Sequence, residues 1–304
     1  MKSLRAPAAA AITAILVIGL YSAYTIGGVI NANAPQNVAF ALGTANRDVT
    51  YCNSETLDIY VPSTTAAHAL PLVIYVHGGG LSTGDKSDIN PLFLNALASA
   101  GFAVASVNYR LAPLAKFPTQ IEDVKCAMRY LRANAQTYGF NGNEFFAFGT
   151  SSGGELVALA ALTGGRSVFD VGSYSNQSSG LLAAVDMFVP TNLTEASGYS
   201  SSDLFRVFGD NQSAEVLGSP THFVIANAPP LMIIQGVDDM NVPEAQSIQL
   251  YNELRAAGDQ TQLILVQNMG HMFVQEGPEP ISPSLEQMAQ EMVSFFQQYV
   301  QGGG

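Results

Sequence analysis

The chain has 304 residues, of which 48% are hydrophobic, and its formal net charge is -12 at pH 7. This hydrophobic content excludes an intrinsically disordered chain, and the length is sufficient for one large α/β domain or two small ones. The acidic balance, without any run of lysines or arginines, argues against nucleic acid as a partner, because a basic patch is needed to displace counterions from phosphates.

The first residues have the composition of an export signal. Lys2 and Arg5 precede a stretch without charge, residues 6–30, that contains a dense apolar run. The segment as a whole exceeds the core of about 7–15 residues in a signal peptide and approaches the roughly 20 that span a bilayer. A cleaved signal peptide and a retained membrane anchor therefore both fit residues 1–30. In either case the rest of the chain is expected to be secreted, periplasmic or anchored outside the membrane.

A polar linker over residues 31–47 is expected to lead into one domain over residues 48–301. Residues 48–51 and 56–61 alternate as an antiparallel hairpin would. Continuous apolar runs, typical of parallel strands covered on both faces, then alternate with helical segments. The expected strands are 72–76, 102–107, 144–148, 185–189, 231–234 and 262–266, and the expected helices are 91–100, 117–138, 155–160, 243–257 and 284–300. This order predicts an α/β fold with a doubly wound, mostly parallel sheet.

Three other segments carry structural expectations. The helix over residues 117–138 has two faces of different character. Its apolar face carries Ile121, Val124, Met128 and Leu131. Its charged face, which is expected to point outward, carries Glu122, Lys125, Arg129 and Arg132. Residues 164–180 are rich in serine and lack periodicity, which predicts a loop. Residues 190–229 are irregular and partly helical, and so long an insertion within a domain tends to be functional. We expect it to form a lid or a substrate wall.

The chain has only two cysteines, Cys52 and Cys126. Two cysteines exclude a thiolate-rich metal cluster and a disulfide framework, although a single disulfide stays open. Cys52 lies beside the first expected strand and Cys126 lies on an expected helix. We expect two separate thiols.

Residues 149–154, GTSSGG, join an expected strand to an expected helix. A sharp turn between strand and helix needs glycines two residues before and after its central serine, because the two elements approach closely there. Ser151 has glycine at both offsets, whereas Ser152 has Thr150 at the first. Ser151 is therefore the candidate nucleophile, although this short pattern also occurs in ordinary turns.

A serine that attacks a carbonyl needs a base, an acid that orients the base, and donors for the oxyanion. Of the four histidines, His271 directly follows an expected strand at the edge of the sheet where Ser151 lies. The others lie in a surface loop, in a glycine run and in the insertion: His68, His77 and His222. Asp238 and Asp239 follow the preceding strand, and each fits either the acid or a turn residue. Residues 77–80, HGGG, offer backbone amides for an oxyanion.

Five motifs give the chain a resemblance to a known family: HGGG at 77–80 with GDK at 84–86, NYRLAP at 108–113, GTSSGG at 149–154, GxxDxxVP at 236–243, and GH at 270–271. Their order resembles that of α/β-hydrolase carboxylesterases, above all the hormone-sensitive-lipase-like enzymes and the bacterial feruloyl and acetyl-xylan esterases. The resemblance implies an α/β-hydrolase fold and a serine esterase that needs no cofactor and no metal. It assigns Ser151 as nucleophile, His271 as base, Asp239 as acid, and the amides of Gly79, Gly80 and Ser152 as the oxyanion hole.

Departures from the family pattern bear on the substrate. Leu81 replaces a common aromatic residue, and Gln235 and Glu155 replace common histidines. Only a short linker precedes the expected hairpin, so we expect no N-terminal helical cap of the kind found in the hormone-sensitive-lipase-like enzymes and expect residues 190–229 to shape the acyl and alcohol pockets. The chain has no tryptophan, which argues against stacking on a polysaccharide. A short-chain or small soluble ester is the expected substrate.

Two other functions stay open at this point. An amidase or peptidase would use the same triad, and a non-catalytic binding module could share the fold. The sequence favours an esterase because nucleophile, base, acid and oxyanion donors are all present. The expected partner is a small-molecule ester, with membrane attachment only through residues 6–30, and no oligomeric state is predicted.

Overall fold

The computed structural model describes residues 42–63, 68–195 and 197–301. The expected signal or anchor over residues 1–30 and most of the expected linker lie outside the described residues. Among the helices of the described ranges, none is both long enough and apolar enough to cross a membrane.

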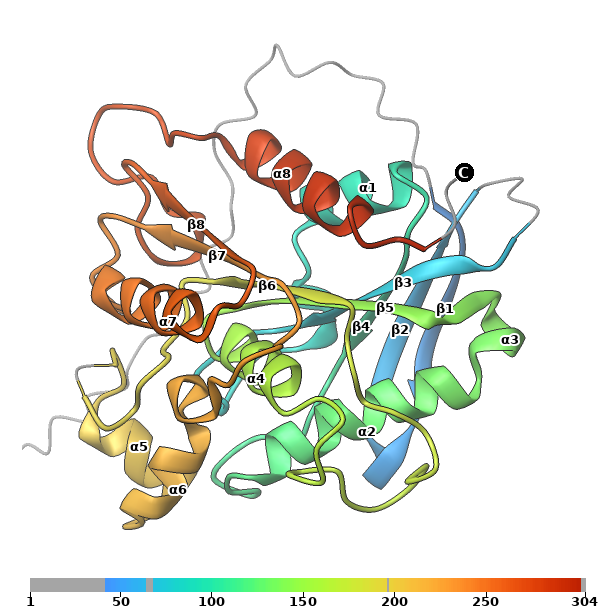
Figure 1. The fold of residues 1–304 in the computed structure, drawn as a ribbon, viewed down its shortest axis with the longest axis horizontal. Coiled ribbons are helices and arrows are strands. Elements are labelled where there is room, and N and C mark those ends of the chain that lie inside the picture. The colour runs from blue at the N-terminus through green and yellow to red at the C-terminus, as the bar shows by residue number, and fades with distance from the viewer. Residues whose placement is uncertain (1–41, 64–67, 196, 302–304) are drawn as a thin grey trace, which may run out of the picture. The chain divides into compact units, whose positions relative to one another are not determined.

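An eight-stranded sheet forms the centre of the domain, in the order β1-β2-β4-β3-β5-β6-β7-β8 (Figure 1). The strands are β1 (Leu42–Thr50), β2 (Thr56–Pro62), β3 (Leu70–Val76), β4 (Ala103–Val107), β5 (Phe140–Thr150), β6 (Ala183–Met187), β7 (Leu231–Gly236) and β8 (Thr261–Val266). β2 pairs antiparallel with both β1 and β4, and all the other neighbours pair in parallel. The predicted mostly parallel sheet with an N-terminal antiparallel hairpin is confirmed.

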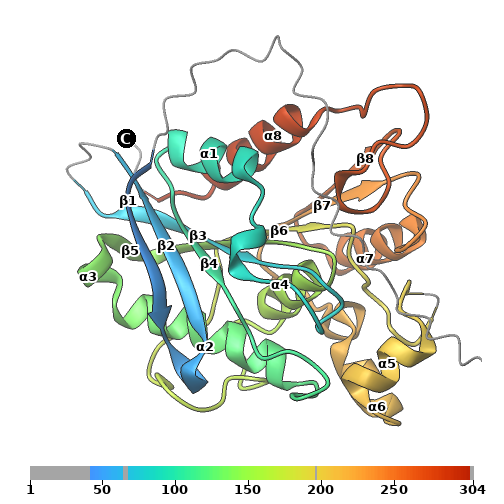
Figure 2. The same cartoon turned by 180° about the vertical axis from the view of Figure 1, so that it is seen from behind.

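Helices cover both faces of the sheet (Figures 1 and 2). They are α1 (Pro91–Ser99), α2 (Thr119–Ala133), α3 (Ala135–Tyr138), α4 (Ser152–Leu162), α5 (Ser201–Phe208), α6 (Gln212–Gly218), α7 (Glu244–Ala257) and α8 (Leu285–Gln297), with short 3-10 turns η1 (Cys52–Ser54), η2 (Lys86–Asp88), η3 (Pro220–Phe223) and η4 (His271–Phe273). α1 and α8 pack on one face, and α2, α4 and α7 pack on the other. Along β3, Leu72 and Ile74 face the second group while Val73 and Tyr75 face the first. A strand covered on both sides therefore reads as a continuous apolar run.

The hairpin begins earlier than predicted. β1 starts at Leu42 and pairs with β2 from Pro62 onward, so the expectation that the linker extends to residue 47 is wrong. β1 is an edge strand, and its residues 43–48 are exposed. A strand with no buried face shows no alternation of hydrophobic and polar residues, so the sequence pattern could not reveal this part of β1.

The outward-pointing charges predicted for α2 are a second correction. Lys125 and Arg129 are buried, with 0% and 1% of their surfaces exposed. Lys125 Nζ lies 2.7 Å from one oxygen of Asp170, and the guanidinium of Arg129 forms an ion pair with the other. Asp170 belongs to the serine-rich segment 164–180, which lacks helix and strand and covers this face of α2. Burial of a cation is tolerable because it is paired.

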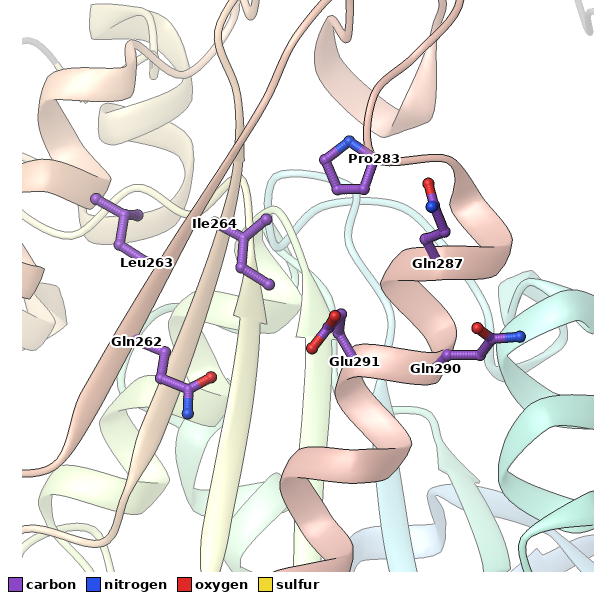
Figure 3. A pocket seen from close by; sticks show the side chains of 7 residues that line it. All are labelled: Gln262, Leu263, Ile264, Pro283, Gln287, Gln290 and Glu291. Atoms are coloured by element: carbon purple, nitrogen blue, oxygen red, sulfur yellow. The ribbon is translucent and has the colours of Figure 1, made fainter.

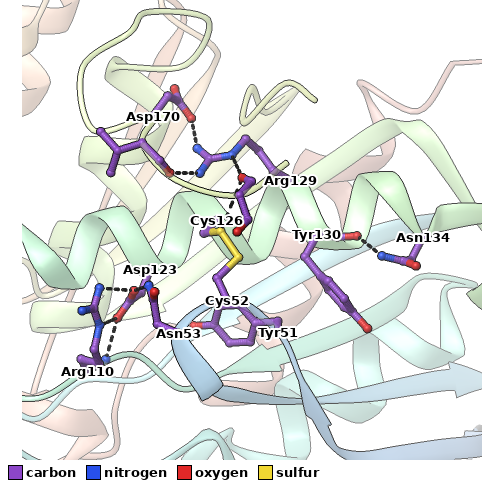
Figure 4. The surroundings of a disulfide bond; sticks show 12 residues. Tyr51, Cys52, Asn53, Arg110, Asp123, Cys126, Arg129, Tyr130, Asn134 and Asp170 are labelled. Atoms are coloured by element: carbon purple, nitrogen blue, oxygen red, sulfur yellow. Dashed lines mark hydrogen bonds and ion pairs between the residues drawn. A yellow bond between two sulfur atoms is a disulfide. The ribbon is translucent and has the colours of Figure 1, made fainter. Parts of the chain in front are cut away.

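The cysteines form a third correction. Cys52 and Cys126 are joined by a buried disulfide with Cα atoms 6.2 Å apart, so the expectation of two separate thiols is wrong (Figure 4). The bond links the turn between β1 and β2 to the middle of α2. Beside it, Asn53 Nδ2 donates to Asp123, which also accepts three hydrogen bonds from Arg110, two of them from its guanidinium. The disulfide and these polar contacts hold the hairpin against the helical layer.

Removal of this disulfide should destabilise the domain substantially. The bond closes a loop across a sequence separation of 74 residues, and a loop of that size restricts the unfolded chain by about 4 kcal/mol. We expect the double variant Cys52→Ala/Cys126→Ala to lose about that much free energy of unfolding in urea denaturation. Wild-type protein denatured with a thiol reductant present is the matched control. Equal denaturation midpoints for oxidised and reduced wild type would contradict the prediction.

Candidate active site

Ser151 occupies the single residue between the end of β5 and the start of α4. Its backbone has φ 51 and ψ -129, a combination that non-glycine residues rarely adopt and that often marks functional sites. The Ser151 amide donates to the Met187 carbonyl at 2.8 Å, and its own carbonyl accepts from the Glu155 amide at 3.1 Å. The turn is therefore held from the neighbouring strand and from the helix that follows it.

The flanking glycines are required by close contacts. A Cβ on Gly149 would lie 2.5 Å from the carbonyl carbon of Gly153, and a Cβ on Gly153 would lie 2.2 Å from the carbonyl oxygen of Val76. No side chain fits at either position. These contacts are the close approach that the glycine offsets around Ser151 predict.

The structure brings the three residues Ser151, His271 and Asp239 into one hydrogen-bonded chain. His271 Nε2 lies 3.0 Å from Ser151 Oγ, and His271 Nδ1 lies 2.8 Å from Asp239 Oδ2. They come from the carboxyl ends of three different strands: the serine follows β5, the aspartate follows β7, and the histidine begins η4 after β8. A nucleophile, a base within reach of it and a group that orients the base are thus in place.

Of the two candidate aspartates, only Asp239 reaches the histidine. Asp239 is buried, and its Oδ1 accepts from the amides of Asn241 and Val242, both at 2.8 Å. Burial raises the pKa of this carboxyl, but the hydrogen bonds from His271 and from the two amides outweigh it, so the net pKa is lowered. Asp238 is exposed. Asp239 is consequently an ionised partner for the imidazole.

The other histidines lie apart from this chain. His68 and His222 are exposed. His77 is buried and stacks on Tyr109 with ring centroids 4.3 Å apart, while the Tyr109 hydroxyl donates to the His77 carbonyl at 2.8 Å. Burial lowers the pKa of His77, so its ring stays neutral. It supports the base of the glycine run that follows it.

The glycine run approaches the serine in conformations that favour glycine. Gly79 has φ 111 and Gly80 has φ 60. The Leu81 amide, next in the chain, donates to Ser152 Oγ at 3.2 Å and ties the run to the start of α4. The Ser152 amide is the first of the helix and so has no intrahelical acceptor. Backbone donors from two segments therefore lie beside Ser151.

A cavity of about 380 Å³ opens at this point of the molecule. Its lining comprises the glycine run with Ser151 and His271, and further side chains that the sequence analysis did not identify: Tyr75, Thr83, Asp88 and Met272. Tyr75 Oη lies 3.3 Å from Thr150 Oγ1, and burial raises the pKa of Tyr75 to about 12. The sequence did contain a signal for Tyr75, namely a tyrosine near the end of a buried strand. The hydroxyl of a buried tyrosine needs a hydrogen-bond partner or a pocket.

Phe188 was also missed. It directly follows β6 with φ 47, and its ring meets that of His271 edge to face at a centroid distance of 5.1 Å. The contact limits the rotation of the imidazole. No local pattern in the sequence distinguishes this phenylalanine from the others in the core.

A second hollow, of about 460 Å³, lies between β8 and α8 (Figure 3). It is lined by Gln262, Leu263, Ile264, Pro283, Gln287, Gln290 and Glu291. This lining contains no serine, cysteine or histidine, so it does not repeat the groups found beside Ser151. Within the described ranges, no group of three or more His, Cys, Asp or Glu side chains is placed to hold a metal ion.

A strained serine between a parallel strand and a helix, linked through histidine to an aspartate at the end of another parallel strand, defines an α/β-hydrolase. The BD-FAE family model matches residues 57–254. The chain belongs to this family.

Individual relatives are similar over most of the domain. LipC, an esterase of Mycobacterium tuberculosis, is 28% identical over 230 residues, which cover 72% of this chain and 57% of LipC. Ethyl acetate hydrolase of Pseudomonas putida is 29% identical over 231 residues, covering 71% of this chain and 70% of that enzyme. Among solved structures, a truncated carbohydrate esterase from gut microbiota superposes with a TM-score of 0.75 at 28% identity, covering 86% of this chain and 98% of the other. The chain spans about half the length of several curated relatives it matches.

Proposed function

We propose that the protein is a serine carboxylesterase that hydrolyses short-chain esters of small soluble alcohols through an acyl-enzyme intermediate. The observation that carries the proposal is the chain of hydrogen bonds from Ser151 Oγ through His271 to Asp239. The relatives' names, an esterase, an ethyl acetate hydrolase and a carbohydrate esterase, support ester hydrolysis.

In the proposed reaction, Ser151 Oγ forms a bond to the ester carbonyl carbon while its proton passes to His271 Nε2. The carbonyl electron pair moves onto oxygen, and Asp239 stabilises the imidazolium. The bond to the alcohol oxygen then breaks, and His271 Nε2 returns the proton to the departing alcohol. Water attacks the acyl-enzyme by the same path, so that the carboxylic acid leaves and Ser151 regains its proton.

We assign the oxyanion hole to the backbone amides of Gly79, Gly80 and Ser152. The assignment is supported by the cavity that the two glycines share with Ser151 and by the free first amide of α4. A donor of this kind contributes about 3–4 kcal/mol to transition-state stabilisation. No cofactor takes part in these steps.

An ester panel combined with active-site labelling tests the proposal. We expect an organophosphonate to label folded protein stoichiometrically at Ser151, and acetyl and butyryl p-nitrophenyl esters to turn over much faster than octanoyl or feruloyl esters. Acetyl p-nitroanilide is the matched amide, and its hydrolysis should be far slower. Preferred cleavage of the anilide would assign an amidase instead, and unlabelled Ser151 in folded protein would favour a non-catalytic binding module.

We also propose that the domain works outside the cytoplasm. The composition of residues 1–30 supports export, and the buried disulfide between Cys52 and Cys126 supports an oxidising compartment, where such bonds persist. Whether residues 6–30 stay attached to a membrane remains a prediction.

A further inference from the structure

Tyr199 lies in the insertion, in the segment between β6 and α5, and reaches the first turn of α4. Its hydroxyl donates to Glu155 Oε2 at 3.0 Å. Glu155 stands four residues after Ser151, so this hydrogen bond ties the insertion to the helix that begins at the nucleophile.

The ring of Tyr199 also lies against the glycine run. A Cβ built on Gly80 would lie 3.7 Å from Tyr199 Cε1, which is van der Waals contact. Gly80 is one of the residues that line the cavity around Ser151. Tyr199 itself does not line that cavity, so its ring meets the site through Gly80.

The backbone before Tyr199 is fixed by the loop that carries the acid. Gly198 has φ 93, and a Cβ there would lie 2.0 Å from the carbonyl oxygen of Asn241. The Asn241 amide is one of the two that bind Asp239. Tyr199 is thus held by three segments that meet at the site: the glycine run, the first turn of α4 and the acid loop.

Glu155 explains why the tyrosine keeps this position. The side chain of Glu155 is completely buried, and its Oε1 has no hydrogen-bond partner among the described residues. Burial raises the pKa of Glu155 well above its usual value, against the opposing effect of the Tyr199 hydroxyl, so the group is neutral. The hydroxyl of Tyr199 is its one side-chain partner in the described chain, and a displaced ring would leave the whole carboxyl unpaired at high cost.

The direction of the acyl group follows from the other two substituents of the reacting carbon. The leaving oxygen must lie beside His271 Nε2 to receive its proton, and both His271 and Met272 line the cavity. The carbonyl oxygen must face the amides beside Gly80 and Ser152. The acyl chain takes the remaining direction at the reacting carbon, and we place it past Gly80, toward the ring of Tyr199.

We propose that Tyr199, positioned by Glu155, is the wall that closes the acyl side of the site and restricts the acyl group to short chains. This inference deepens the proposed esterase function and rests on it. Tyr199 acts by occupying space. It therefore affects the selectivity for acyl-chain length and not the selectivity for the alcohol.

The test compares kcat/KM for acetyl, butyryl and hexanoyl p-nitrophenyl esters, normalised to active sites titrated with an organophosphonate. In the wild type we expect kcat/KM to fall by more than about tenfold from acetyl to hexanoyl. Several methylene groups that find no pocket should lower kcat/KM by at least that factor. Tyr199→Ala should abolish this fall or reverse it. Tyr199→Phe, which keeps the ring, should retain it.

Phe205→Ala is the matched control, because this aromatic residue of the same insertion is 61% exposed and should leave the acyl profile unchanged. Tyr199→Val replaces Tyr199→Ala if the alanine variant does not fold. An unchanged ratio of acetyl to hexanoyl turnover in the folded small-residue variant overturns the inference, as does a wild type that prefers hexanoyl.

Failure of the inference and failure of the proposed function give different results. If Ser151→Ala keeps the ester turnover of the wild type, the esterase assignment itself is wrong. If Ser151→Ala loses turnover and Tyr199→Ala keeps the wild-type profile, only the role of Tyr199 is wrong.

Discussion

Replacement of Ser151 by alanine should lower kcat for p-nitrophenyl acetate by about a millionfold, the loss seen when a triad nucleophile is removed. The variant keeps His271, Asp239 and the backbone amides, so a small residual rate from those groups is expected above that of water. Stopped assays at high enzyme concentration can measure it. The thermal unfolding midpoint should stay close to that of the wild type, because the side chain of Ser151 is removed from a cavity and not from the core.

Ser152→Ala is the matched control for this prediction. It removes a hydroxyl from the adjacent residue but keeps the backbone amide assigned to the oxyanion hole. The Leu81 amide loses its acceptor at Ser152 Oγ, which costs about 1–3 kcal/mol of stability because the donor is buried. Turnover should largely persist. Loss of turnover in Ser152→Ala together with its retention in Ser151→Ala would show that the two serines were assigned the wrong way round.

The positions of Ser151 and His271 could be predicted because each is set by local constraints. The same constraints left Asp238 and Asp239 open for the acid, and only the family resemblance favoured Asp239. A Cβ on Gly149 would lie 2.5 Å from the carbonyl carbon of Gly153, so the sequence has to carry glycine where the strand and helix touch. The histidine and the aspartate follow buried apolar runs, and the carboxyl ends of parallel strands share one edge of a sheet. The same constraints fix the order of helices and strands.

Features that depend on distant partners could not be predicted in this way. A period of 3.6 residues placed Lys125 and Arg129 outward, because the pattern treats charge as exposure and does not include the Asp170 that pairs with both. The disulfide likewise joins residues 74 positions apart, and its formation depends on the packing of α2 against the hairpin. Strand β1 was shortened in the prediction because an exposed edge has no buried face to detect.

The residues around the site also divide into those that local sequence could predict and those that depend on distant partners. The glycine run was recognised from its sequence, whereas Tyr199 and Glu155 are separated by 44 positions and meet only in the folded chain. Glu155 is a charged residue type in the first turn of a helix, where an exposed carboxylate is ordinarily favourable. Its complete burial here means that the position contributes to the shape of the site and not to the helix dipole.

Asp239→Asn should lower kcat by about 10⁴-fold, whereas Asp238→Asn should leave it nearly unchanged. The structure gives the reason for the first effect. Asp239 Oδ1 accepts from two amides, those of Asn241 and Val242, so the amide oxygen of an asparagine has to take that position. Its NH₂ group then faces His271 Nδ1 and forces that nitrogen to accept a hydrogen bond.

The proton of the neutral imidazole moves to Nε2 as a consequence, and His271 can no longer take a proton from Ser151. The hydrogen-bond geometry is preserved, so the thermal unfolding midpoint should change much less than kcat. Asp238 is exposed, and the carboxylate bonded to His271 Nδ1 is that of Asp239, which makes Asp238→Asn a control of equal chemistry one residue away. Activity lost in Asp238→Asn but kept in Asp239→Asn would mean that the aspartate seen beside His271 is not the one that orients it during turnover.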